Sequence, residues 1–322
     1  MLPAPVSTSR RHGQGFSLRR TSLLARSRAT NLAVLSLVSF TFISFLLNIR
    51  AFYFSSNEQR SNPPLSVLAS LPDLQDNLSH LIVVPGHAIW QGTNPDLRMK
   101  ADEWAFQSFQ ANQDVSQSSR LDVFFQHISS AAELALEDEH SLVVFSGGQT
   151  QRASTTTEGE SYLRLALKAG LFRSDTFRRA TSENHALDSF QNLLFSIARF
   201  HEFTGHYPYK ITVVGYEMKR ARFIELHRAA IRWPDNRFHY IGIDAPGDNS
   251  LARQGERQNG YLPYVSDLYG CHTFLANKRR QRNYAARYPS YHFSNPQLAP
   301  LLSWCPQDHT EMFGGTLPWL SL

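Results

Sequence analysis

Four short apolar segments, each followed by glycine or proline, recur in the middle of the chain. They occupy residues 81–84, 142–145, 211–214 and 238–243. Segments of this length that are apolar on both faces are typical of strands buried in a parallel sheet. The pattern therefore predicts a sheet that contains these four strands.

Helical spacing of apolar residues is found between and after these segments, at residues 120–139, 157–168, 188–200 and 219–231. The second of these begins with a capping-box sequence at Thr157. Alternating strands and helices predict an α/β body over residues 78–250, with a Rossmann-like, mostly parallel open sheet and flanking helices. Residues 251–322 lack a clear period, and we expect them to form a C-terminal wrap or lid.

The first 77 residues differ from the body. Residues 32–49 carry no charge and are almost entirely apolar, which meets the usual length of a membrane-spanning helix. We predict one transmembrane helix over residues 31–54, acting as a signal anchor. A basic cytosolic tail (1–30) precedes it and a polar linker (55–77) follows it. A buried core helix or a cleaved signal peptide would produce a similar segment.

The distribution of arginine indicates an orientation. Residues 1–60 hold eight arginines and one acidic residue, and six of those arginines precede the apolar segment. Because basic flanks stay in the cytosol, we expect the body to lie in the lumen of the secretory pathway. A stretch rich in Arg and Ser and free of acids also describes a mitochondrial presequence, so a mitochondrial membrane is the alternative. The sequon Asn77-Leu78-Ser79 fits a luminal body.

Composition narrows the function classes. The net charge is +5, and because residues 1–60 contribute +7, the rest of the chain carries −2. A nucleic-acid-binding body is therefore not expected, since phosphate binding needs a basic face on the folded part. Cys271 and Cys305 can form one bridge or none. The basic run at residues 278–282 indicates either a solvated turn or a contact with phosphate or membrane headgroups.

Candidate chemistry is sought where the strands end, because ligands of open α/β sheets bind there, near the switch in strand order. The loops after the first three strands begin at Pro85, Ser146 and Gly215. Two adjacent glycines let backbone amides approach a ligand, so we expect Gly147 and Gly148 to hold an anionic group, although a plain turn would use them equally well. Neither GxGxxG nor GxxxxGK[ST] occurs, so dinucleotide and P-loop signatures are absent from the sequence.

Polar side chains in and after these loops complete the expected site, whose ligand would be a small anionic, nucleotide-like or glycan-like molecule. We expect Arg220 to point inward and interpret Lys219 and Arg222 as surface charge. The expected catalytic residues are Glu183, Glu158 and His87. The expected ligand-binding residues are Gly86, Ser146, Gly147, Gly148, Ser189, Asn192, Glu217 and Arg220.

Four motifs occur in a fixed order: VVPGH, SGG followed by TEGES, SENHALDSFQN, and VVGYEMKRAR. These motifs and their order resemble those of the YdcF/SanA/ElyC-like family, also called domain of unknown function 218. The resemblance covers roughly residues 80–245. The segment at residues 192–234, together with the later DLYGCH and KRRQRN, is most similar to the fungal branch of that family. The matching positions are Gly86, Ser146, Gly147, Gly148, Glu158, Glu183, Ser189, Asn192, Met218, Arg220 and Ala221.

The resemblance implies a Rossmann-like fold. It also implies S-adenosylmethionine as a candidate cofactor, because a bacterial relative is associated with binding it, and other bacterial relatives are membrane-anchored proteins of cell-envelope maintenance. The chain departs from the family pattern at three positions: Glu217 replaces a His, Gln191 replaces a Glu, and His87 replaces a Gly. We hypothesise that His87 and Glu217 have exchanged roles, which requires that they face each other across the pocket.

Three hypotheses follow. The first is an enzyme or small-molecule binder in which a carboxylate acts as general base and His87 as acid. The second is a non-catalytic, membrane-tethered scaffold with a degenerate pocket. Convergent Glu158, Glu183 and Arg220 around an open cleft would favour the first, and a cleft filled by apolar side chains the second. The third is a cation held by carboxylates and His87. No HxH, CxxC or DxD spacing supports a metal site, so none is predicted.

Overall fold

The computed structural model describes residues 20–58, 75, 77–107 and 117–321. The chain divides into two units, residues 1–60 and 61–322. Most of the predicted basic tail and most of the predicted linker lie outside the described residues.

The first unit contains one long helix, α1 (Arg20–Glu58). Its stretch Thr30–Arg50 has a mean hydropathy of 2.2 with none of it buried, so it is long and apolar enough to cross a membrane, as a signal sequence also would be. Polar groups in this stretch bond within the helix. Thr41 Oγ1 donates to the Leu37 carbonyl (2.8 Å), and Asn48 Nδ2 donates to the Ser44 carbonyl (2.7 Å). Such internal bonds reduce the cost of polar groups in hydrocarbon.

The second unit is built on a five-stranded sheet in the order β5-β4-β1-β6-β7. Its strands are β1 (His80–Pro85), β4 (Ser141–Ser146), β5 (Ala180–Glu183), β6 (Lys210–Gly215) and β7 (Phe238–Gly242). Every neighbouring pair is parallel. The predicted α/β class with a mostly parallel open sheet is therefore confirmed.

The pattern of apolar runs missed one strand of this sheet. β5 lies at the edge, and its residues alternate between half-buried and buried positions, so it includes Thr181, Ser182 and Glu183 and no apolar run. A small antiparallel pair, β2 (Ile89–Trp90) and β3 (Trp104–Ala105), was also not predicted. Two 3₁₀ turns lie between these two strands, η1 (Pro95–Leu97) and η2 (Ala101–Glu103).

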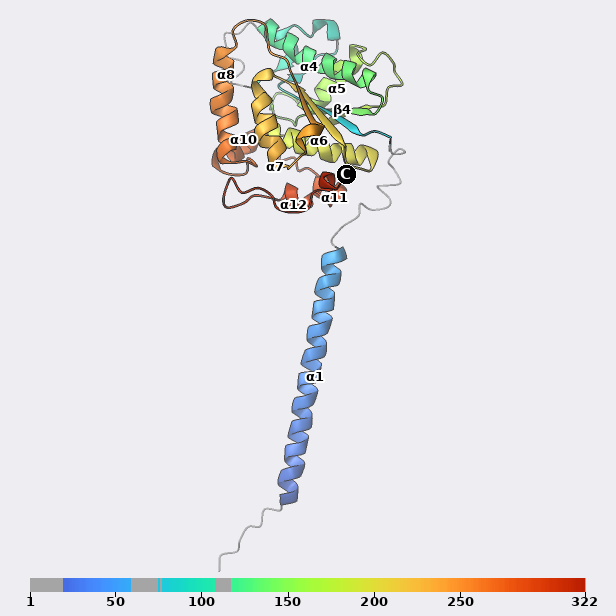
Figure 1. Ribbon diagram of the computed structural model, residues 1–322, viewed down its shortest axis with the longest axis vertical. Helices are drawn as coiled ribbons and strands as arrows, with labels where there is room; N and C mark the ends of the chain where they lie inside the picture. Colours follow the sequence, from blue (N-terminus) through green and yellow to red (C-terminus); the bar gives the residue numbers. More distant parts are fainter. Residues whose placement is uncertain (1–19, 59–74, 76, 108–116, 322) are drawn as a thin grey trace, which may run out of the picture. The chain divides into compact units, whose positions relative to one another are not determined.

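Helices cover both faces of the sheet (Figure 1). Along β1, Leu81 and Val83 face the core that contains α6 (Ser189–Thr204). Ile82 and Val84 face the core that contains α4 (Gln117–Glu137) and α5 (Glu158–Lys168). The alternation explains why the strand reads as a continuous apolar run, since both of its faces are buried.

The fourth predicted helix is interrupted. The chain after β6 forms a 3₁₀ turn, η3 (Glu217–Lys219), then a π-helical segment, η4 (Arg222–His227), and then α7 (Arg228–Ala230). A further 3₁₀ turn, η5 (Asp235–Arg237), leads into β7. Because 3₁₀ and π segments have tighter and wider turns than an α-helix, side chains here do not follow a 3.6-residue period.

The C-terminal region packs against the body, and it is more helical than its sequence indicated. Its elements are α8 (Ser250–Glu256), the π-helical η6 (Arg257–Tyr261), α9 (Leu262–Ser266), α10 (Thr273–Arg282), α11 (Tyr291–Ser294), α12 (Ala299–Leu302) and the 3₁₀ turn η7 (Pro318–Leu320). Its residues Tyr264, Tyr291 and Trp319 belong to the core on the α6 face. A disulfide joins Cys271, just before α10, to Cys305, just after α12.

Candidate functional site

The strand order places the topological switch between β1 and β6, where ligands of open α/β sheets bind. His87 follows β1 and Lys219 follows β6. The Lys219 Nζ atom lies 3.3 Å from His87 Nδ1, so the two strand ends meet through these side chains. The backbone amide of His87 donates to the Tyr162 hydroxyl at 3.2 Å, which fixes the loop against α5.

Four cationic side chains gather at this switch, and we call them the cationic cluster: Lys219, Arg222, Lys278 and Arg282. The first two come from η3 and η4, and the last two from α10. Burial, followed by the charge of Arg222, lowers the pKa of Lys219 to about 7. Burial, followed by the charge of Arg282, lowers the pKa of Lys278 to about 8. Each lysine is thus half-buried and held close to other positive charges.

Hydrogen bonds and an ion pair hold the cationic cluster in place. Arg282 Nη1 donates to the Leu187 carbonyl (2.7 Å), and its Nη2 donates to Gln107 Oε1 (2.6 Å). Arg222 Nε lies 3.3 Å from the carboxylate of Glu256 on α8. The basic run is therefore neither a turn nor wholly solvated, because α10 carries two of its members to the strand ends.

His87 is a neutral member of the site. Burial lowers its pKa well below the usual value, and the charge of Lys219 lowers it further. The ring of His87 lies against those of His127 (centroids 5.6 Å apart) and Tyr216 (5.0 Å). His127 Nε2 lies 3.0 Å from the Ile243 carbonyl and, as an N–H, donates to it. A neutral imidazole beside Lys219 can accept or transfer a proton at Nδ1.

Glu158 supplies a buried carboxyl group beside the cationic cluster. It accepts hydrogen bonds from Thr150 Oγ1 and from Gln107 Nε2 (3.3 Å). Burial raises its pKa, while Thr150 and the charge of Arg282 oppose that rise. A Cβ atom added at Gly86 or Gly147 would lie 2.5 or 2.7 Å from the Cβ of Glu158. These glycines are required because Glu158 packs directly against their backbone.

The amides of the double glycine do not face a ligand, which corrects the expected role of Gly147 and Gly148. Gly147 N donates to the Glu183 carbonyl (3.0 Å), and Gly148 N donates to the Ala186 carbonyl (2.6 Å). The first amides of α5 are also satisfied: Glu158 N donates to the Gly148 carbonyl (3.1 Å) and Glu160 N to the Thr157 hydroxyl (3.0 Å). The loop that contains Gly147 and Gly148 therefore connects β4, β5 and α5 by backbone hydrogen bonds.

Glu183 is the centre of a sealed polar group that we call the carboxylate hub. Its carboxylate accepts from Ser146 Oγ (2.7 Å), His185 N (2.7 Å), Ala186 N (3.2 Å) and Tyr291 OH (3.0 Å). Burial raises its pKa and these donors oppose the rise. Ser146 Oγ also lies 3.0 Å from Asn192 Oδ1. Sequence reasoning brought Ser146, Glu183 and Asn192 together correctly. However, Glu183 is 0% exposed, so the expected catalytic carboxylate is shielded from solvent.

Three other expected ligand-binding residues lie outside the site. Ser189 Oγ pairs with His227 Nε2 at 2.7 Å. Arg220 is half exposed and makes two 2.7 Å bonds to the carboxylate of Glu217. Glu217 therefore faces Arg220, and His87 faces Lys219, so the hypothesis that His87 and Glu217 exchanged roles is not met.

Arg222, which the sequence indicated as surface charge, is the buried arginine, with 7% of its surface exposed. The 3₁₀ turn η3 and the π-helical η4 change the direction in which successive side chains point, so Arg220 turns outward and Lys219 and Arg222 turn inward. Convergence of Glu158, Glu183 and Arg220 around one open cleft is thus not found. The missed residues are Lys219, Arg222, Lys278, Arg282 and Glu256. The basic run at residues 278–282 was their one visible signal.

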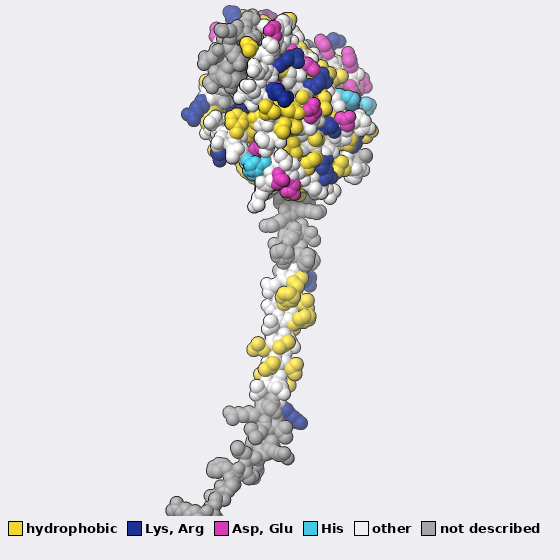
Figure 2. Space-filling model, turned by 60° about the vertical axis from the view of Figure 1, so that its left-hand side comes forward, with side chains coloured by type: hydrophobic (Ala, Val, Ile, Leu, Met, Phe, Trp, Pro, Cys, Tyr) yellow, Lys and Arg dark blue, Asp and Glu magenta, His cyan; other side chains and the backbone are white. Residues whose placement is uncertain are grey.

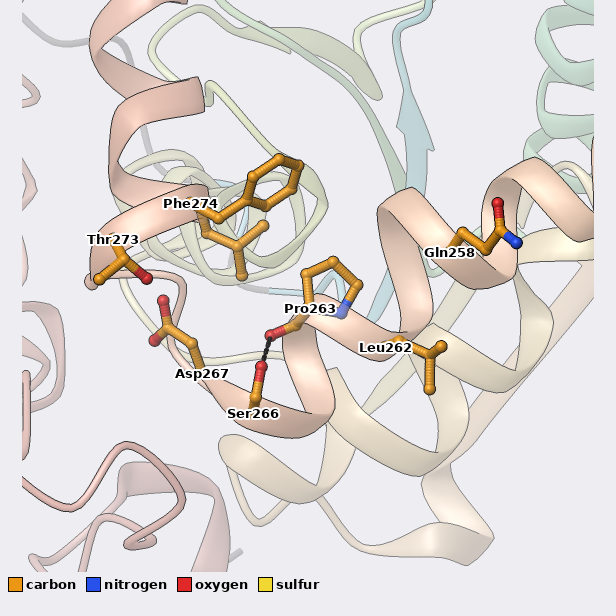
Figure 3. A pocket seen from close by; sticks show the side chains of 8 residues that line it. Gln258, Leu262, Pro263, Ser266, Asp267, Thr273 and Phe274 are labelled. Atoms are coloured by element: carbon orange, nitrogen blue, oxygen red, sulfur yellow. Dashed lines mark hydrogen bonds between the residues drawn. The ribbon is translucent and has the colours of Figure 1, made fainter.

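A surface hollow of about 320 Å³ lies between the π-helical η6, α9 and α10. Figure 3 labels seven of the residues that line it: Gln258, Leu262, Pro263, Ser266, Asp267, Thr273 and Phe274. Leu275 lines it as well. Two of its polar side chains, Ser266 and Asp267, already have partners. Ser266 Oγ donates to the Pro263 carbonyl (3.0 Å), and Asp267 accepts from the amides of Cys271 and His272.

Figure 2 turns the side that carries α8 and α10 toward the viewer, where hydrophobic side chains gather among basic ones. The exposed hydrophobic residues of α9 and α10 include Leu262, Val265 and Phe274. The hollow offers shape without reactive groups, so the cationic cluster with His87 and Glu158 is the candidate functional site.

Comparison with known proteins gives one similarity. The chain is 30% identical over 263 residues to the uncharacterized protein YOR238W of Saccharomyces cerevisiae, a match that covers 65% of this chain and 84% of the yeast protein. No family model matches the chain. No solved structure matches it either.

Proposed function

The chain belongs to the same family as the yeast protein YOR238W, and we propose that it is a membrane-anchored α/β protein whose strand-end site binds a small phosphate-bearing ligand. The observation that carries this proposal is the cationic cluster, in which four positive side chains meet at the switch point with Glu158 and Glu256 beside them. The proposal narrows the expected anionic ligand to one with concentrated negative charge.

Electrostatics supports this ligand class. Bringing like charges together away from water is costly, and the lowered pKa values of Lys219 and Lys278 reflect that cost. An anion among these side chains would remove the repulsion and accept charge-assisted hydrogen bonds. The arrangement suits a phosphate or diphosphate group better than S-adenosylmethionine, whose sulfonium is itself positive. His87 and Glu158 stand beside such a ligand as a proton acceptor and a proton donor.

The anchor and its orientation are part of the proposal. We infer that α1 spans the membrane and that the body lies on the luminal side. The arginine-rich sequence before the span supports this orientation. The disulfide between Cys271 and Cys305 also supports it, because such bonds persist mainly in oxidising compartments.

We further propose that this family is related to the YdcF/SanA/ElyC-like proteins. The support is that three of the matching motif positions, Ser146, Glu183 and Asn192, contact one another across β4, β5 and α6. Motifs that meet in space are less readily explained by chance than motifs that only share an order along the chain.

The second candidate function is the non-catalytic scaffold. One observation favours it: Tyr291 closes over Glu183, and the amides of Gly147 and Gly148 are used within the fold. In this case the hub would only stabilise the body, and the cationic cluster would bind no small molecule.

A thermal-shift screen of the full chain in detergent separates the two. The probes are sulfate, inorganic phosphate, pyrophosphate, S-adenosylmethionine and divalent metal salts. A ligand that binds the native state at 100 times its Kd stabilises it by about 2.7 kcal/mol. We expect pyrophosphate to raise the Tm most and the metal salts alone to leave it unchanged. If none of the anions raises the Tm at millimolar concentration, the scaffold is the better description.

A further inference from the structure

The strand-end site does not use the sequon at residues 77–79, which lies at the start of the body, immediately before β1. Asn77 is exposed in a turn, Leu78 is fully buried, and Ser79 is exposed. We propose that Asn77 carries an asparagine-linked glycan. This inference rests on the luminal orientation proposed above, and it goes beyond the ligand-binding site.

The local structure holds the backbone of the sequon and leaves its side chains to solvent. Ser79 N donates to the His140 carbonyl (2.8 Å), and the Ser79 carbonyl accepts from Tyr209 N (2.8 Å). His140 Nδ1 lies 3.0 Å from the Asn77 carbonyl. Within the described part of the chain, no hydrogen bond engages the Asn77 carboxamide. A sugar attached there before folding would therefore remain in water afterwards, at no cost to the core.

The chemistry needs a co-substrate of one class, a lipid-diphosphate-linked oligosaccharide. The Asn77 amide nitrogen loses a proton and forms a bond to the anomeric carbon of the sugar. The bond from that carbon to the diphosphate breaks, and the lipid diphosphate leaves. The sequon supplies the acceptor asparagine and the hydroxyl residue two positions later, which the transferring enzyme requires.

Position along the chain favours this asparagine as an acceptor. Asn77 follows Arg50, the last residue of the apolar stretch, by 27 residues, so it can move away from a membrane that holds the stretch. The five strands are parallel, and Asn77 precedes β1. It therefore lies at the amino-terminal edge of the sheet, whereas the cationic cluster lies at the carboxyl-terminal edge. A glycan at Asn77 would leave the ligand site open.

The experiment is translation of the full chain in the presence of endoplasmic-reticulum microsomes, followed by electrophoresis with and without an enzyme that removes asparagine-linked glycans. We expect the wild-type band to migrate more slowly by the mass of one glycan, which we call the step, and we expect the enzyme to abolish this shift. Asn77→Gln and Ser79→Ala should remove the step, whereas Ser79→Thr preserves the sequon and should keep it. Because the transfer takes place on the unfolded chain, these readouts do not depend on the stability of the variants.

A second acceptor distinguishes failure of the glycan from failure of the orientation. Ser174→Asn creates the sequon Asn-Asp-Thr in an exposed loop between α5 and β5, and it is tested in the Asn77→Gln background. If the wild type shows no step and this double variant shows one, the body is luminal and the glycan at Asn77 is refuted. If neither chain shows a step, the luminal orientation is refuted and the glycan with it, while anion binding is still judged by the thermal-shift screen.

Discussion

Two polar groups lie at the carboxyl ends of the same sheet and are satisfied in opposite ways. The carboxylate hub, beyond β4 and β5, surrounds one fully buried acid with four donors. The cationic cluster, beyond β1 and β6, holds four positive side chains whose nearby carboxylates are Glu158, Glu256 and Asp188, the last of which pairs with Arg279. A polar group whose hydrogen bonds are complete stabilises the fold, whereas the group with an excess of positive charge is the one at which we propose that a ligand binds.

The sequence motifs identify residues of the carboxylate hub, whereas the charges of the folded protein identify the cationic cluster. SGG, the Glu183 stretch and the Asn192 stretch all end in the hub, so motif order found a structural centre. The cationic cluster is drawn from residues far apart in the chain, with the C-terminal wrap supplying half of it. The predictions below test this division from the largest expected effect to the smallest.

Loss of the hub acid should cause the largest loss of stability. Glu183→Ala leaves several buried donors without an acceptor, at about 1–3 kcal/mol each, so we expect the free energy of unfolding to fall by roughly 4 kcal/mol. Chemical denaturation of the full chain in detergent measures it. Glu160→Ala, an exposed glutamate on the same helix turn as Glu158, is the control and should change little. A Glu183→Ala protein with unchanged stability and lost anion binding would assign Glu183 to the ligand site instead.

Opening the disulfide should have the next largest effect and should affect both groups. Cys271→Ser with Cys305→Ser removes a bridge that closes a loop of 34 residues, at a cost of roughly 3–4 kcal/mol in the free energy of unfolding. The loop includes α10, with Lys278 and Arg282, and also Tyr291 of the hub. We therefore expect weaker binding of pyrophosphate as well, measured by calorimetry below the lowered Tm. Anion affinity equal to that of the wild type would mean that α10 holds its place without the bridge.

Removing a cation should separate ligand binding from stability. Lys219→Met or Arg282→Met takes away a charge-assisted hydrogen bond to the anion, a loss of about 1.5–3 kcal/mol, or roughly 10- to 100-fold in Kd for pyrophosphate. Without ligand, Lys219→Met should be as stable as the wild type or more so, because the repulsion within the cationic cluster falls, whereas Arg282→Met also loses its bonds to Leu187 and Gln107. Lys168→Met, at an exposed lysine that ends α5, serves as the matched control. Equal losses of affinity in all three variants would show that only net charge matters.

The fold could be predicted further than the site, for physical reasons. Apolar runs revealed β1, β4 and β6 because both faces of these strands are buried. β7 was found because its sequence is mostly apolar, although His239 and Ile241 are exposed at the sheet edge. β5 escaped because its residues 181–183 are polar. The helix cap at Thr157 was readable because capping is local in sequence. The inward turn of Arg222 depends on a π-helical segment, which no 3.6-residue period indicates.

The C-terminal half of the site was hidden for a different reason. Lys278 and Arg282 reach the strand ends only through the tertiary packing of α10, and a basic run of this kind is usually solvated. The expectation for Gly147 and Gly148 failed because a glycine pair near a helix start serves close packing as well as anion binding. Here the neighbouring Glu158 Cβ leaves no space for a side chain at Gly147.

The lysine at the switch point should make anion binding depend on pH. The pKa of Lys219 is lowered from 10.5 to about 7 in the ligand-free protein, so its contribution to stability is present above pH 10.5 and is lost as the pH falls through 7. An anion stabilises the protonated form, so loss of the Lys219 proton should lower the affinity about fivefold between pH 7 and pH 8. Lys278, with a pKa of about 8, should add a further fall of about twofold. Sulfate is the appropriate probe, because it does not titrate in this range. Lys219→Met should flatten the profile to the smaller fall that Lys278 causes, and a profile that keeps its full slope in that variant would assign the titration to another group.

The smallest effect is expected at the arginine that sequence reasoning placed in the site. Arg220 is 39% exposed and pairs with Glu217, which is 34% exposed, on the outside of η3. Exposed ion pairs contribute at most about 1 kcal/mol, so Arg220→Met should lower the free energy of unfolding by no more than that and leave the Kd for pyrophosphate unchanged. Arg222→Met, two residues further along, is the matched comparison, and it should weaken binding as Lys219→Met does. Binding that is lost in Arg220→Met and retained in Arg222→Met would reverse the assignment of inward and outward arginines. That result would also support the binding site that the sequence predicted, around Glu158, Glu183 and Arg220.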